Sequence, residues 1–139
     1  MRVNSNVMRN SVQRLAHSAH YVVSHEYETV WLTREGAGPI VVGDFYGDPN
    51  VAIIDSDEKW CAVGGSGLIV YFFEEPFDEY KYDKQSVQYF EVGREGDDMW
   101  WVKTIQQTGP SEIQVLLETG VTHNITFQRT AKSCAFVVR

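Results

Sequence analysis

Between positions 42 and 73, short apolar runs alternate with turn-forming residues, and this pattern constrains the fold more than any other. The turn formers are Gly-Asp-Pro-Asn (47–50), Asp-Ser-Asp-Glu (55–58) and Gly-Gly-Ser-Gly (64–67). Such punctuation is typical of a β-meander, in which consecutive strands are joined by tight turns. The run at 68–73 is apolar throughout, which predicts a central strand covered on both faces.

The same pattern continues to the end of the chain. Alternation of apolar and polar residues is cleanest at 123–129, where Ile125 and Phe127 point one way and their neighbours the other. The sequence predicts ten strands, at residues 27–33, 40–45, 51–55, 59–63, 68–73, 87–92, 99–106, 112–118, 123–129 and 134–139. We therefore predict a mainly β fold, an antiparallel meander that forms a sandwich or a partly closed barrel.

The first twenty residues follow a different period. Apolar residues recur there at helical spacing, at Met8, Val12, Leu15, Ala16 and Ala19. This spacing predicts one N-terminal amphipathic helix over about residues 6–20.

Length and charge suggest one domain with two electrostatic parts. A chain of 139 residues with 43% hydrophobic side chains fits a single domain over residues 1–139. Residues 1–25, the expected helix or arm, hold three of the twelve basic side chains and none of the nineteen acidic ones. The β body at 26–139 therefore carries a net charge of −10. Such a field repels nucleic acid and favours basic partners.

The chain has no apolar run of membrane-spanning or signal-peptide length, so we expect a cytoplasmic protein without a membrane partner. Cys61 and Cys134 are far apart and form no metal-binding pair, so we expect two reduced thiols.

No stretch of the sequence carries a complete catalytic or cofactor motif. The acidic run at 55–58 lacks the glycine and the final glutamate of a calcium loop, and a hairpin turn explains it. The glycine-rich run at 64–67 has no lysine for a phosphate loop, and Leu68 stands where a nucleophile elbow needs a glycine two positions after Ser66. We assign no catalytic, cofactor-binding or metal-binding residue, and expect no cofactor.

Residues 72–101 are both acidic and aromatic. This interval holds nine carboxylates and nine rings, against three basic side chains. Rings supply rigid contact area and carboxylates attract a basic partner over distance, a combination suited to protein recognition. The alternative is that the rings are core residues and the acids are merely solvated. The partner-binding residues that we predict are Glu74, Glu75, Asp78, Glu79, Tyr80, Tyr82, Asp83, Asp97 and Asp98.

The segment at 43–73, with Gly-Asp-Phe-Tyr-Gly-Asp-Pro at 43–49 and Trp-Cys-Ala-Val-Gly-Gly-Ser-Gly-Leu at 60–68, resembles small bacterial immunity-type proteins of polymorphic and contact-dependent toxin systems. The resemblance consists mainly of turn and core residues and implies kinship of fold. It carries no functional residue onto this chain.

Three functions remain open at this stage. The first is a non-enzymatic interaction protein, of the immunity type, that binds and masks a basic partner such as a toxin. The second is a small-molecule or saccharide-binding β-domain in which Trp31, Trp60, Trp100 and Trp101 stack on a ligand in a barrel mouth. The third is an enzyme whose site is assembled from distant residues. The sequence leaves the oligomeric state open.

Overall fold

The computed structural model describes residues 12–139, which form twelve β-strands and one short 3₁₀ turn, η1 (Gly96–Asp98). The strands form three antiparallel sheets of four. The first sheet holds β1 (Val12–His17), β2 (Tyr21–Glu26), β3 (Thr29–Arg34) and β4 (Ile40–Asp44). The second holds β5 (Val51–Ile54), β6 (Trp60–Gly65), β7 (Gly67–Phe72) and β8 (Tyr89–Val92). The third holds β9 (Val102–Gly109), β10 (Glu112–Leu117), β11 (Thr122–Arg129) and β12 (Cys134–Val138).

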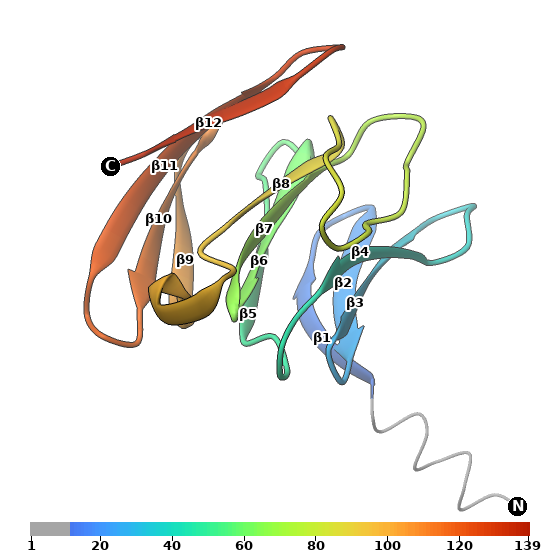
Figure 1. The fold of residues 1–139 in the computed structure, drawn as a ribbon. Coiled ribbons are helices and arrows are strands. Elements are labelled where there is room, and N and C mark those ends of the chain that lie inside the picture. The colour runs from blue at the N-terminus through green and yellow to red at the C-terminus, as the bar shows by residue number, and fades with distance from the viewer. Residues whose placement is uncertain (1–11) are drawn as a thin grey trace, which may run out of the picture.

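Each sheet is a meander in which strands that follow one another along the chain are hydrogen-bonded neighbours. The three sheets stack as layers, with the second sheet in the middle (Figure 1). Their first strands lie next to one another, β1 beside β5 and β5 beside β9. The predicted antiparallel meander is confirmed. It forms stacked open sheets, and the described strands do not close into a barrel.

The middle sheet is buried on both faces. Every residue of β6 and β7 is buried, which confirms the prediction of a central strand at 68–73. Along β7, Leu68 and Val70 contribute to the core shared with the third sheet, while Ile69 and Tyr71 contribute to the core shared with the first. Neighbouring residues therefore point into different cores, as the two-residue period of a strand requires.

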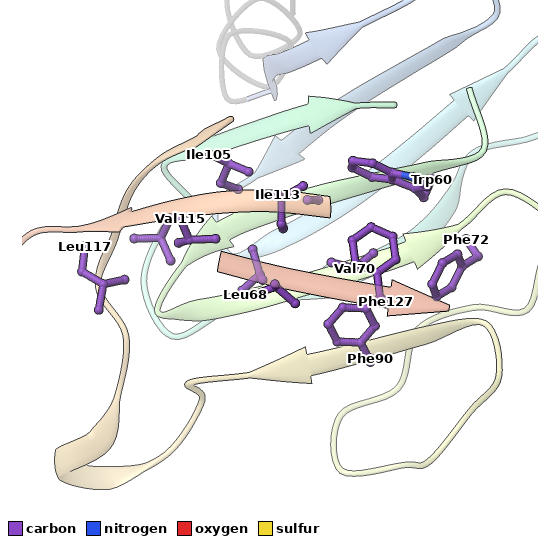
Figure 2. Close-up of a cluster of buried hydrophobic side chains, with 13 residues drawn as sticks. Trp60, Leu68, Val70, Phe72, Phe90, Ile105, Ile113, Val115, Leu117 and Phe127 are labelled. Atoms are coloured by element: carbon purple, nitrogen blue, oxygen red, sulfur yellow. The ribbon is translucent and has the colours of Figure 1, made fainter. Parts of the chain in front are cut away.

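The core between the second and third sheets is built around aromatic contacts. Figure 2 shows side chains of β6, β7 and β8 meeting those of β9, β10 and β11. Phe127 packs against Trp60 and Phe72, with ring centroids 5.1 and 5.8 Å apart. The indole nitrogen of Trp60 donates to the carbonyl of Pro110 at 2.9 Å, so its polar atom is satisfied inside the core.

The core between the first and second sheets is completed by the loop that joins β7 to β8. Phe77 and Tyr80 of this loop pack against Tyr71 and its neighbours. The Tyr71 hydroxyl donates to the carbonyl of Asp78 at 2.6 Å. The Tyr80 amide donates to the carbonyl of Val41 at 2.9 Å, so the loop also covers the open edge of β4.

The prediction of an N-terminal helix over residues 6–20 is wrong for the described part of that range, because residues 12–17 form strand β1. Residues 1–11 of that prediction lie outside the described residues. A β-bulge at Leu15 separates the pairs Arg14–Ser24 and Ala16–Val23, and both Leu15 and Ala16 pack against the core. Because a bulge interrupts the two-residue alternation, two consecutive residues face inward and imitate the spacing of a helix. Among residues 12–139, no helix is long and apolar enough to cross a membrane.

Candidate functional site

The structure divides the predicted partner-binding residues between the two ends of the middle sheet. β8 runs antiparallel to β7, with Tyr89 opposite Tyr71 and Val92 opposite Leu68. Residues that follow β7 and residues that follow β8 therefore lie at opposite ends. The predicted residues at 74–79 belong to the first group, and Asp97 and Asp98 belong to the second.

The acidic residues of the first group are engaged in contacts within the molecule. Glu74 pairs with Arg129 of β11 at 2.5 Å, and Glu75 pairs with Arg34 of β3 at 2.6 Å. Two consecutive carboxylates thus tie the β7–β8 loop to both outer sheets. The Glu79 carboxylate accepts from the Val41 amide at 3.0 Å, and Asp78 bonds through its backbone. These contacts connect residues 74–79 to neighbouring strands of the same molecule.

Tyr80 is also internal. It is 5% exposed, and its hydroxyl donates to Glu91 at 2.6 Å. Burial and then this hydrogen bond raise the pKa of Tyr80 above its usual value. Glu91 in turn pairs with Arg94 at 3.0 Å, so the carboxylate links a buried phenol to a cation.

The guanidinium of Arg94 contacts backbone carbonyls and a ring of the protein. Its guanidinium donates to the carbonyls of Ser66 at 2.6 Å and Asp44 at 2.5 Å, and it lies 4.6 Å from the ring centroid of Phe45. It therefore joins the first two sheets, and Glu91 is the one carboxylate among the described residues with which it forms an ion pair.

A hollow of about 380 Å³ lies beside Arg94. We call it the acidic hollow; its charged and aromatic lining is Tyr82, Asp83, Glu91, Arg94, Glu95 and Asp98. Tyr82 is 61% exposed, and Asp83, Glu95 and Asp98 form no ion pair with any described residue. Of the predicted residues, the structure thus brings together Tyr82, Asp83 and Asp98, and Asp97 lies next to Asp98 in η1.

Two further exposed rings stand at the same end of the middle sheet. Tyr46 is 76% exposed and Trp101 is 48% exposed. The hydroxyl of Ser66 accepts from the Tyr46 amide at 2.8 Å, and the backbone of Ser66 forms a bridge with Trp101. Tyr46 is not among the predicted partner-binding residues, although a ring between Asp44 and the turn at 47–50 has few sequence neighbours to bury it.

A second, larger hollow of about 690 Å³ lies between β8, β12 and the β7–β8 loop. We call it the β12 hollow. Phe90 and Phe136 line it and stack with ring centroids 4.4 Å apart. Lys84 and Lys132 also line it.

The four tryptophans do not share a site. Trp60 is buried in a core, Trp100 stacks on His123 with centroids 4.3 Å apart, and neither hollow is lined by a tryptophan. Cys61 and Cys134 are free thiols, and burial raises the pKa of Cys61 to about 12. Within residues 12–139, no three His, Cys, Asp or Glu side chains are grouped so as to hold a metal ion.

Comparison of the chain with protein-family models, curated proteins and solved structures gave no match.

Proposed function

We propose that this protein acts by binding rather than by catalysis, and that it captures and masks a basic partner protein, as an immunity protein masks a toxin in the cytoplasm. The acidic hollow is the binding site. The observation that supports this proposal most is the group of carboxylates in the hollow that lack an ion-pair partner among the described residues. Asp83, Glu95 and Asp98, which form no ion pair with any described residue, line the same hollow as the exposed Tyr82. Arg94, which also lines it, pairs with Glu91 and donates to two backbone carbonyls.

The chemistry of the hollow suits an arginine or lysine side chain. A cation can lie over the Tyr82 ring while Asp83, Glu95 and Asp98 supply acceptors. The net charge of −10 on residues 26–139 attracts a basic protein before contact and raises the association rate. Tyr46 and Trp101 offer further ring surface at the same end of the molecule.

A charge-reversal pair tests this assignment. In Glu95→Lys/Asp98→Lys, we expect the association rate with a fluorescein-labelled Arg-Gly repeat peptide, and with the protein encoded by the adjacent gene, to fall at least about tenfold. The control is Glu35→Lys/Asp57→Lys, which makes the same change of net charge at exposed positions away from the hollow. Stopped-flow fluorescence at two salt concentrations measures both variants.

Two results would contradict the proposal. An equal loss in both double variants would show attraction by net charge without a site. If Tyr82→Ala dissociates from the partner at the same rate as the parent and unfolds at the same midpoint, this ring does not contact the partner.

A further inference from the structure

β12 is an outer strand whose second edge pairs with no described strand. Asn124 and Arg139 exchange both backbone hydrogen bonds, at 3.1 and 2.8 Å, so they form a hydrogen-bonded pair. Because such pairs alternate along an antiparallel ladder, Ala135 and Val137 also bond to β11. Cys134, Phe136 and Val138 therefore direct their N–H and C=O groups away from the sheet.

Two other sheet edges in the described part of the chain, those of β4 and β9, are contacted by neighbouring segments. The β7–β8 loop covers the edge of β4 through the Tyr80–Val41 hydrogen bond. Asn50 donates its side-chain amide to the carbonyls of Val102 and Lys103 at the start of β9. β12 has no charged residue, proline or bulge along its length, although these are the usual means of blocking an edge.

The side chains of β12 are apolar and accessible. Phe136, Val137 and Val138 are 37%, 55% and 36% exposed. Phe136 also lines the β12 hollow, so an added strand has a place for a side chain beside the Phe90–Phe136 stack.

We propose that the edge of β12 binds an extended apolar segment of a partner protein, which adds a fifth strand to the third sheet and carries a carboxylate toward Lys84 and Lys132. Strand addition draws affinity from the main-chain hydrogen bonds and specificity from alternate side chains. Two acids also line the β12 hollow. Glu91 is bound by Tyr80 and Arg94, and Asp83 is shared with the acidic hollow. The two lysines have no ion-pair partner among the described residues.

A second copy of the chain fits this edge less well. Antiparallel self-pairing of β12 brings Lys132 of one copy toward Arg139 of the other, and the strand holds no carboxylate to meet the lysines. The β12 hollow has two lysines in its lining and the acidic hollow has none. The proposal for β12 therefore rests on its own observations and does not depend on the proposed function.

The experiment uses a defined peptide with ¹⁵N-labelled full-length protein. The probe is acetyl-Thr-Val-Thr-Phe-Thr-Val-Glu-Glu-amide, whose acidic end lies near Lys132 when it pairs antiparallel to β12. We expect saturable NMR shifts of the Cys134, Phe136 and Val138 amides at probe concentrations up to about 1 mM. A probe with two C-terminal lysines in place of the glutamates should bind at least about tenfold more weakly.

Two variants separate the edge from the rest of the sheet. Val138→Pro removes an outward N–H and leaves the bonds to β11 intact, so we expect at least a tenfold rise in Kd, about 1.4 kcal/mol, with little loss of stability. Val137→Thr, on the opposite face, should bind as the parent does. Should Val138→Pro fold poorly, Lys132→Glu serves instead, and it should favour the lysine probe.

Three outcomes overturn the proposal. The first is the absence of saturable shifts in the parent protein. The second is equal binding by the parent and Val138→Pro. The third is a concentration-dependent dimer in sedimentation equilibrium that Val138→Pro abolishes, because the edge would then belong to a second copy.

Discussion

Glu58 joins two hairpin turns of different sheets. Its carboxylate accepts from the Ser18 hydroxyl, from the His20 amide at 3.0 Å, and from the His20 ring at 2.7 Å. The Ser18 hydrogen bond and then the bonds from His20 lower the pKa of Glu58 to about 2. The same carboxylate raises the pKa of His20 above 6.5. The side chain of His20 is 67% exposed, so solvent moderates the pairing.

The pair predicts a pH dependence of stability. His20 has a raised pKa in the folded state, so its contribution is complete below pH 6.5 and disappears as the pH rises through the folded value. Glu58 has a lowered pKa, so its contribution is present above pH 4.5 and disappears toward about pH 2. We expect Glu58→Gln to destabilise the protein more at about pH 5.5 than at about pH 9 in urea unfolding. NMR can follow the titration of His20 in both proteins. The same titration midpoint in Glu58→Gln as in the parent would contradict this prediction.

Residue types alone could not locate the candidate site. Tyr80 and Tyr82 lie two positions apart in one acidic loop, yet Tyr80 is 5% exposed and Tyr82 is 61% exposed. No periodicity distinguishes them, because the loop forms no regular strand. In the sequence, Glu74 and Glu75 look no different from Asp98. Their ion-pair partners, Arg129 and Arg34, are distant in sequence, so only the fold reveals the pairs.

At the scale of the element, strands were predictable where turns mark both ends. The ten strands predicted from residue 27 onward correspond to β3–β12, with boundaries shifted by a few residues. β1 was missed because its bulge conceals the alternation, and β2 follows it without a run of turn formers. The placement of whole sheets depends on packing between distant segments, which local patterns do not record.

Gly64 shows how closely two elements approach. A Cβ at this position in β6 would lie 2.4 Å from Cγ1 of Val102, a buried residue of β9. We expect Gly64→Ala to lower the free energy of unfolding by about 1–3 kcal/mol through overpacking. Gly38→Ala is the matched control, because an added Cβ there has no neighbour within 4 Å.

Chemical denaturation measures both glycine variants, and the Gly38 change should stay within about 0.5 kcal/mol. Adding Val102→Ala to Gly64→Ala should recover part of the loss, because it removes Cγ1 of residue 102, the atom that the new Cβ meets most closely. A double variant less stable than the sum of its single variants would refute the steric explanation.

At the scale of the whole molecule, the middle sheet makes the three layers interdependent. It contributes to both cores, so unfolding of either outer sheet exposes one of its faces. We expect a single cooperative transition, with tryptophan fluorescence and far-UV circular dichroism giving the same midpoint. Leu68→Ala and Ile69→Ala alter different cores, and each should lower that shared midpoint, at a cost of about 2–5 kcal/mol. Separate midpoints for the two probes would show that the layers unfold independently.

The double burial of β7 also changes what specifies its alignment. In most strands a slip by one residue would expose apolar side chains and bury polar ones, and that penalty enforces one alignment. In β7 both faces are apolar, so the slipped arrangement would satisfy the polarity rule equally well. Besides the Tyr71 hydroxyl, which donates to Asp78, discrimination comes from volume: Gly64 and Gly65 accept close neighbours that any larger side chain would displace. The alignment of the central strands is therefore encoded by the sizes of residues rather than by their hydrophobicity.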